Sequence, residues 1–342
     1  MRKLLLFSLI PLLISCTQER NKQYVKNEAY LAAFNQNFDQ ALLLYNELIE
    51  MDSQDAESYL NRSKIYIQLK EYNSSMADLN SALELNPDDS RILNAMAFIE
   101  NNTGDAVKAL RHLEQALSNI PDYYDAQLQR GTIRSSQGDL LNALYDFDQL
   151  ILRDSLNCDL YINRGIINGR LKKIDLAKSD FMRAAYLDSN DVEANNNLGT
   201  ALLQTNEPAS AKLSFEKVIR LDPSNEFALD KLGMLAIRNK NYESAINWYS
   251  QLVDSKDFGS KANSRLGMIH FELGDLELSR RFLAQSISSD PTQSFAYKYI
   301  ALIDMDEGKV VEACEYIRMS INNGLPFEGN EFIQEIFASC LE

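Results

Sequence analysis

The chain has 342 residues, of which 45% are hydrophobic and 24% are charged, and its formal net charge is −15. This composition predicts a folded body, and the acidic balance argues against nucleic acid as a partner, because that function needs clustered Lys and Arg. The two histidines lie far apart, no Cys/His spacing suits zinc, and no glycine-rich loop after a strand could hold phosphate. No pair of carboxylates stands out either, so we expect no enzyme, no cofactor and no metal.

The first fifteen residues have the pattern of a signal peptide. Arg2 and Lys3 form a positive start, and residues 4–14 are an apolar run that only Ser8 and Pro11 interrupt. This run is well short of the roughly 20 residues that a spanning helix needs.

The run ends in Leu13-Ile14-Ser15-Cys16, which resembles the lipobox of bacterial lipoproteins. The resemblance implies removal of the signal peptide at 1–15, acylation of Cys16, and a lipid-anchored place in a bacterial cell envelope, at the outer membrane. Residues 16–21 are then the acylated cysteine and a short tether. An ordinary secretory signal is the alternative.

From Lys22 to residue 327 the sequence repeats every 34 residues without insertion or deletion. The nine copies begin at residues 22, 56, 90, 124, 158, 192, 226, 260 and 294. Position 8 is always small: Ala29, Ser63, Ala97, Gly131, Gly165, Gly199, Gly233, Gly267 and Ala301. Position 20 is also small: Ala41, Ser75, Ala109, Ala143, Ala177, Ala211, Ala245, Ser279 and Ala313. Position 24 is large and apolar: Tyr45, Leu79, Leu113, Phe147, Phe181, Phe215, Tyr249, Leu283 and Ile317.

Each copy has the pattern of two short amphipathic helices. In the fifth copy these are residues 160–171 and 176–187, and neither could bury its apolar face without neighbours. Glycine recurs at position 15, between the helices, and proline recurs at position 32, after the second helix.

The chain resembles the tetratricopeptide repeat family in its 34-residue period, in the small residues at positions 8 and 20, in the large apolar residue at position 24 and in the proline at position 32. The resemblance implies an all-α fold: a right-handed superhelical solenoid of nine 34-residue helix-turn-helix repeats over residues 22–327. Beyond Gly324 the pattern stops, and we expect a capping helix at 328–342 that covers the end of the stack. A partner docked on that helix is the alternative to a purely structural cap.

Three cysteines follow Cys16. A bridge between Cys314 and Cys340 is conceivable, but the odd number and irregular spacing of these cysteines favour buried free thiols.

An arginine at position 7 and an aspartate at position 23 occur together in the second, fourth and fifth copies. The pairs are Arg62 with Asp78, Arg130 with Asp146, and Arg164 with Asp180. Both positions face the partner helix of the same copy, so we predict a structural ion pair within each of these copies.

By the resemblance, positions 2, 5, 6, 9, 12 and 13 of each first helix line a concave groove that binds a partner. Position 6 carries an amide in three consecutive copies, Gln129, Asn163 and Asn197, and an amide can bond the main chain of an extended peptide. Simple solvation of these amides is the alternative.

In copies seven to nine the same face becomes basic and apolar. The residues are Lys231, Arg238, Lys261, Arg265, Lys298, Phe227, Met234, Phe271 and Phe295. Lys261 and Arg265 match two places of the carboxylate clamp with which some tetratricopeptide repeat proteins grip a partner's C-terminus. The other three places hold Lys231, Asn196 and Thr200, where the clamp has Asn, Lys and Asn. We therefore expect an acidic or carboxylate-ended segment, with a merely solvated face as the alternative.

The sequence thus predicts a membrane-anchored scaffold that binds a protein or peptide in cell-envelope assembly or secretion. The alternative is a surface lipoprotein that binds a carbohydrate or another nutrient through the aromatic and basic residues of the last copies. The only tryptophan, Trp248, lies on a second helix away from the groove, which disfavours that alternative.

Overall fold

The computed structural model describes residues 21–326 together with Gln334 and Cys340. Within these residues the chain forms eighteen α-helices and no strand, which confirms the predicted all-α fold. None of the helices described there is long and apolar enough to cross a bilayer. The predicted signal peptide, Cys16 with the tether up to residue 20, and all of the predicted capping helix except Gln334 and Cys340 lie outside the described residues.

The chain divides into two compact units, residues 1–150 and residues 151–342. The first unit contains α1 (Lys22–Phe34), α2 (Phe38–Met51), α3 (Ala56–Gln68), α4 (Tyr72–Leu85), α5 (Ser90–Asn102), α6 (Ala106–Asn119) and α7 (Tyr124–Gln137). The boundary falls within α8 (Leu140–Arg153). The second unit contains α9 (Cys158–Arg170), α10 (Ile174–Leu187), α11 (Val192–Gln204), α12 (Pro208–Leu221), α13 (Glu226–Arg238), α14 (Tyr242–Ser250), α15 (Gly259–Glu272), α16 (Leu276–Ser289), α17 (Ser294–Asp306) and α18 (Val310–Asn322).

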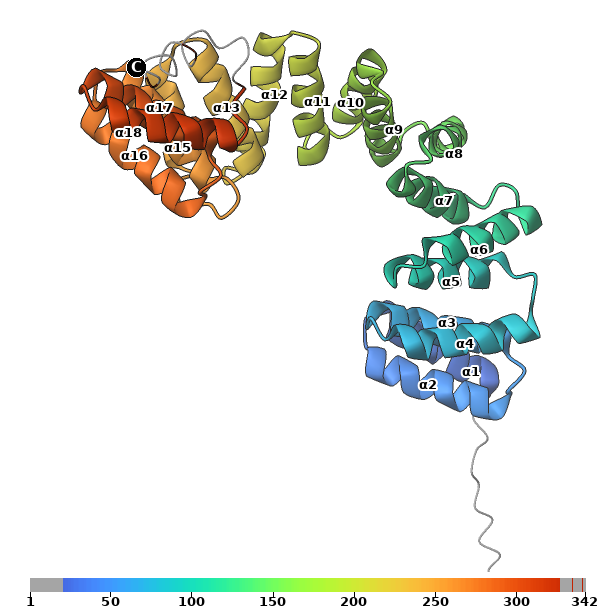
Figure 1. Ribbon diagram of the computed structural model, residues 1–342. Helices are drawn as coiled ribbons and strands as arrows, with labels where there is room; N and C mark the ends of the chain where they lie inside the picture. The colour runs from blue at the N-terminus through green and yellow to red at the C-terminus, as the bar shows by residue number, and fades with distance from the viewer. Residues whose placement is uncertain (1–20, 327–333, 335–339, 341–342) are drawn as a thin grey trace, which may run out of the picture. The chain divides into compact units, whose positions relative to one another are not determined.

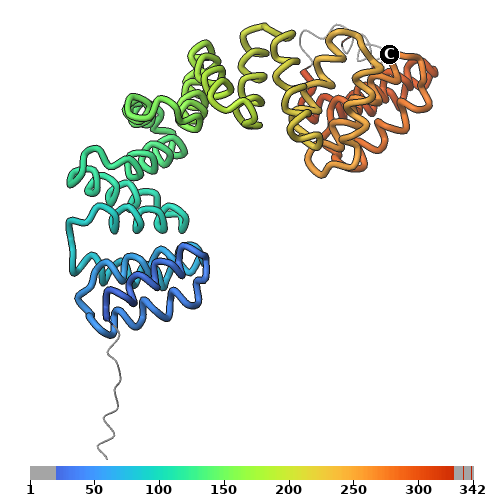
Figure 2. The backbone as a smooth tube through the Cα atoms, turned by 180° about the vertical axis from the view of Figure 1, so that it is seen from behind, coloured from blue at the N-terminus to red at the C-terminus, as the bar shows by residue number. Residues whose placement is uncertain are grey.

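Odd-numbered helices are the first helices of the copies, and even-numbered helices are the second. The two helices of a copy pack on each other, as α5 and α6 do, and each second helix packs on the next first helix within its unit (Figure 1). The reverse view in Figure 2 shows the same succession of pairs within each unit. Every first helix begins within one residue of the start of a 34-residue copy.

The turn between the two helices is the same in every copy. Position 15 has a positive φ in all nine, although it is glycine in only four of them. The other five use Gln36, Lys70, Lys172, Asn206 and Lys240, with φ between 54° and 63°. A left-handed backbone costs an ordinary L residue about 1–2 kcal/mol, so helix packing imposes the turn even where the residue does not favour it.

The helices of a copy approach most closely at position 8. A Cβ built on Gly165 would lie 2.6 Å from the ring of Phe181, which leaves no room for a methyl group. In the third copy, by contrast, Ala97 shares its buried cluster with the smaller Leu113. Glycine paired with an aromatic ring recurs at Gly131–Phe147, Gly199–Phe215 and Gly233–Tyr249. In these copies glycine at position 8 makes room for the aromatic ring at position 24, whereas the first copy pairs Ala29 with Tyr45 and the eighth pairs Gly267 with Leu283.

The seventh copy departs from the others. Its second helix, α14, has 9 residues instead of 13 or 14, and turns occupy residues 251–258 before α15 begins at Gly259. A Cβ on Gly259 would lie 2.7 Å from the carbonyl oxygen of Val253, so this glycine lets the start of α15 pack against the turns that follow the shortened helix.

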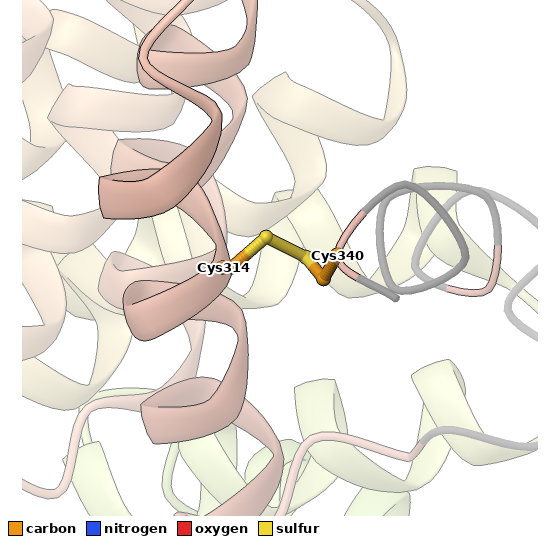
Figure 3. The surroundings of a disulfide bond; sticks show 2 residues. All are labelled: Cys314 and Cys340. Atoms are coloured by element: carbon orange, nitrogen blue, oxygen red, sulfur yellow. A yellow bond between two sulfur atoms is a disulfide. The ribbon is translucent and has the colours of Figure 1, made fainter. Parts of the chain in front are cut away.

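The expectation of free thiols at Cys314 and Cys340 is wrong. The two form a disulfide with a Cα–Cα distance of 5.6 Å, which joins α18 to the C-terminal segment (Figure 3). Cys314 is at position 21, where Lys178 and Arg280 of other copies reach into the following copy. Cys314 and Cys340 are 26 residues apart in the sequence, so their proximity becomes apparent only from the packing of the chain end. Cys158 is a free thiol, as expected.

We expect Gly165→Ala to lower the free energy of unfolding by about 1–3 kcal/mol, because the added methyl group meets the Phe181 ring. Combining it with Phe181→Leu should recover part of that loss, since Ala with Leu is the pairing of the third copy. Urea unfolding of the two single variants and the double variant measures both effects. Strictly additive losses would contradict the size matching.

Candidate partner-binding surfaces

The first helices form the surface on which partner-binding residues were predicted. Several first helices of successive copies contact one another within a unit: α3 with α5, α5 with α7, α9 with α11, and α15 with α17. We call positions 2, 5, 6, 9, 12 and 13 of the first helices the groove face.

The structure brings together each arginine at position 7 with the aspartate of its own copy. The Nε atoms of Arg62, Arg130 and Arg164 donate to Asp78, Asp146 and Asp180 at 2.8, 3.1 and 3.2 Å. All three carboxylates are buried, and each also accepts from the Nη2 atom of its arginine. These residues join the two helices of a copy rather than meeting a partner.

Two of these carboxylates accept a further donor from position 11, which sequence reasoning missed. Arg134 donates to Asp146 at 2.8 Å, and Asn168 donates to Asp180 at 2.9 Å. Position 11 lies one helical turn beyond position 7, so the spacing could have revealed this donor.

Lys261 is already engaged within the protein. Its Nζ lies 2.8 Å from Oδ2 of Asp230, which is buried in α13, and Lys231 Nζ lies 3.7 Å from the same oxygen. The lysine that resembled part of a carboxylate clamp thus neutralises a buried carboxylate of the preceding copy. The sequence does not reveal that Asp230 pairs with Lys261, because the two residues are 31 positions apart.

Arg265 and Lys298 lie on an aromatic cluster that joins α15 to α17. The Arg265 guanidinium is 4.5 Å from the centre of the Phe295 ring, and Lys298 Nζ is 5.4 Å from that of Tyr299. Tyr299 in turn contacts Phe295 and Phe271, with ring centres 5.0 and 5.5 Å apart. Among the described residues, neither cation has a carboxylate within ion-pair distance, so both charges are open to an anion.

Burial governs titration in this cluster. It lowers the pKa of the Lys298 ammonium below its ordinary value, an effect that nearby Glu272 partly offsets. It also raises the pKa of Tyr299 to about 12. A carboxylate brought next to Lys298 would raise the pKa of this lysine again, which favours binding of an anion.

The remaining basic and apolar residues lie on α13. Lys231 covers the ring of Phe227 at 4.8 Å, while Phe227 and Met234 are both exposed. Arg238 is exposed at the end of the helix, and its Nη2 atom lies 3.5 Å from Oδ1 of Asn206. Together these side chains give the groove face of copies seven to nine a mixed cationic and apolar surface.

The three amides of position 6 differ in what they bond. Gln129, in the first unit, donates to Asn94 at 3.0 Å. Asn163, in the second unit, donates to the carbonyl of Asp159 one turn earlier. Asn197, also in the second unit, is half-buried. Since two of the three are already bonded within the protein, the amides are a weaker candidate than the cationic surface.

Sequence reasoning missed a pocket of about 620 Å³ on the groove face of copies one and two. The residues that line it are Gln23, Lys26, Asn27, Tyr30, Leu31, Tyr45, Glu57, Asn61 and Lys64. Asn27 and Asn61 are at position 6, so the amides of that position also occur in the first copies. An adjoining pocket of about 700 Å³ contains ion pairs of Lys22 with Asp52 and of Arg91 with Glu57.

Among the described residues, Cys158, Asp188 and Asp191 could each turn one ligand atom toward a metal ion, with these atoms within 4.8 Å of one another. Both carboxylates already accept backbone N–H groups, from Asn190 and Ala194. Burial also raises the pKa of the Cys158 thiol, which disfavours the thiolate that a metal needs. Capping of the turn accounts for this group.

Family models described as tetratricopeptide repeat match residues 35–99, 159–191, 192–225 and 231–294, which together are more than half of the chain. The chain belongs to the tetratricopeptide repeat family. It is similar to mouse tetratricopeptide repeat protein 16, with 24% identity over 106 residues, which are 31% of this chain and 14% of that protein. The match thus spans about a seventh of the relative's length.

Two solved structures support the tetratricopeptide fold. A tetratricopeptide repeat protein from Parabacteroides merdae aligns with a TM-score of 0.54 and 17% identity, over 74% of this chain and 99% of that one. PilF of Pseudomonas aeruginosa aligns with a TM-score of 0.53 and 18% identity, over 59% and 93%. At this identity the likeness concerns the fold. Tetratricopeptide repeat proteins are typically scaffolds for protein–protein interaction rather than enzymes.

We expect Asp180→Ala to lower the free energy of unfolding by about 2–3 kcal/mol, because it removes the acceptor of Asn168 and a buried ion-pair partner of Arg164. Asp175→Ala, on the same helix, is the control. Its side chain is 92% exposed and lies 3.9 Å from Lys178, so the change should stay within about 0.5 kcal/mol. Equal melting temperatures for the two variants would refute a stabilising role of the pair.

Proposed function

We propose that this protein is a lipid-anchored scaffold of a bacterial cell envelope that binds an acidic or carboxylate-ended protein segment on its groove face. The observation that carries the proposal is the open cationic cluster of Arg265 and Lys298 on the rings of Phe295 and Tyr299. In a chain of net charge −15, such a cluster attracts anions locally. Apolar rings beside the cations would bury the side chains that accompany a carboxylate.

Arg265 and Lys298, rather than Lys261, would meet the partner's carboxylate. Lys261 holds the buried Asp230 at 2.8 Å, so moving it away would leave that carboxylate with only Lys231, at 3.7 Å. Lys231, Arg238, Phe227 and Met234 would extend the surface along α13. The anchor would place this surface in cell-envelope assembly or secretion, at the outer membrane, a role that rests on analogy. Trp248 packs partly buried between two core clusters, so no observation specifically favours the carbohydrate alternative.

Arg265→Glu tests the binding surface. The probe is a fluorescein-labelled hexapeptide of four glutamates and two leucines with a free C-terminal carboxylate. We expect saturable binding that weakens with salt and falls at least tenfold in the variant, as measured by fluorescence anisotropy. Arg220→Glu, an exposed arginine on α12, is the matched control and should bind as the unaltered protein does. Equal affinities for the two variants would remove this site, and an amidated probe separates recognition of the chain end from recognition of acidity.

Cys16→Ser tests the anchor. We expect the unaltered protein to incorporate a labelled fatty acid and to sediment with membranes, and the variant to lose the label. Cys158→Ser is the control, because it removes a thiol from the folded repeats and should keep the label. Equal labelling of both variants would contradict acylation at Cys16.

A further inference from the structure

We propose that the outer face of α1, at the N-terminal end of the array, docks an amphipathic α-helix of a partner protein. The face consists of Tyr24 and Leu31 at positions 3 and 10, and Phe34 at position 13 adjoins it at the edge of the groove face, where Leu31 also lines the pocket of copies one and two. It is distinct from the cationic cluster of copies seven to nine. The proposal is independent of the function proposed above.

Comparison of the nine copies shows that this face is exceptional. Position 10 is buried in copies two to nine, with exposures of 3% or less: Ile65, Ile99, Ile133, Ile167, Ala201, Leu235, Ile269 and Ile303. Position 3 is buried in the same copies, at 1% or less: Ser58, Ile92, Ala126, Leu160, Ala194, Ala228, Ala262 and Ala296. In the first copy position 3 is Tyr24, which is 57% exposed, and position 10 is Leu31, which is 55% exposed.

Position 13 adds a second difference. It is polar or charged in the other eight copies: Gln68, Asn102, Ser136, Arg170, Gln204, Arg238, Glu272 and Asp306. In the first copy it is Phe34, which is 74% exposed. Leu31 and Phe34 are three residues apart and therefore share one side of the helix. Large exposed apolar patches on a folded protein often mark interaction sites.

The internal junctions define the chemistry of the occupant. Positions 3 and 10 of a first helix pack in one cluster with positions 24 and 27 of the preceding second helix. Examples are Ala126 and Ile133 with Leu113 and Ala116, and Ala228 and Leu235 with Phe215 and Val218. The fitting partner is thus a helix with a large apolar residue, a small or medium apolar residue three positions later, and an apolar residue next to that.

Among the described residues, a second copy of this chain does not offer that helix at its C-terminal end. Positions 24 and 27 of α18 are Ile317 and Ser320, and both are fully buried. Cys314 of the same helix is bonded to Cys340. A second α1 would pair two first helices, whereas the clusters of the internal junctions join a first helix to a second helix. These observations favour a helix from a different protein.

The test uses the purified full chain and a labelled peptide with the sequence of α6, residues 106–119, which carries Leu113, Ala116 and Leu117 at the required spacing. We expect saturable binding by fluorescence anisotropy, weakened at least tenfold by Leu31→Asp and by Phe34→Gln. Phe34→Gln introduces the residue that copies two and six carry at this position, so it should preserve folding. Leu213→Asp, at a 66% exposed position on α12, is the matched control and should bind normally. A peptide with Leu113→Asp should not bind.

Several outcomes would overturn the proposal. One is absence of saturable binding, and another is equal binding by Leu31→Asp and Leu213→Asp. A dimer in sedimentation that Leu31→Asp disperses would make a second copy the occupant. If the protein binds phosphatidylglycerol vesicles but not the peptide, and Leu31→Asp abolishes the vesicle binding, then the occupant of the face is a lipid surface. Arg265→Glu should leave peptide binding unchanged, so failure of this proposal is separable from failure of the groove-face proposal.

Discussion

The close approach of two helices at position 8 is the constraint on which the rest of the structure depends. A small residue there lets the side chain at position 24 fill the space between the helices, as in Gly165 with Phe181 and Ala97 with Leu113. Close packing of this kind tolerates neither an added methyl group nor a void. Because the same contact recurs in each copy, one helix pair can stack on the next within each unit.

Stacking makes every copy depend on its neighbours, and the two ends of the array differ. Positions 3 and 10 are buried wherever a second helix precedes them, but α1 presents Leu31 and Phe34 to solvent. At the other end, a disulfide joins Cys314 to Cys340. A repeat protein needs its terminal faces covered or made polar. Among the described residues the N-terminal face of α1 is apolar and mostly exposed, which is why we propose a partner helix there.

Charge has two roles in this acidic protein. Buried aspartates at position 23 hold the helices of three copies together through arginine, and Asp230 holds Lys261 across a junction between copies. These charged groups are therefore paired within the protein. Arg265 and Lys298 lie instead on aromatic rings, with no carboxylate at ion-pair distance among the described residues. Burial lowers the pKa of Lys298, and a carboxylate brought beside this lysine would raise that pKa again. The groove face of the last copies thus combines open cations with apolar surface.

The sequence by itself determined the period, the helix pairs and the contacts within a copy, because these depend on fixed spacings along one or two helices. Arg164 could be matched to Asp180 in this way, since both lie in one 34-residue unit. Contacts between copies depend on the angle and offset at which helices stack, and no spacing encodes those. Tertiary structure alone therefore decided that Lys261 serves Asp230, that Cys314 meets Cys340, and that Leu31 is exposed although its counterparts in the other copies are buried. The fold could be predicted from a local repeat, whereas the candidate sites arise where neighbouring copies meet or where, among the described residues, no second helix precedes a first helix.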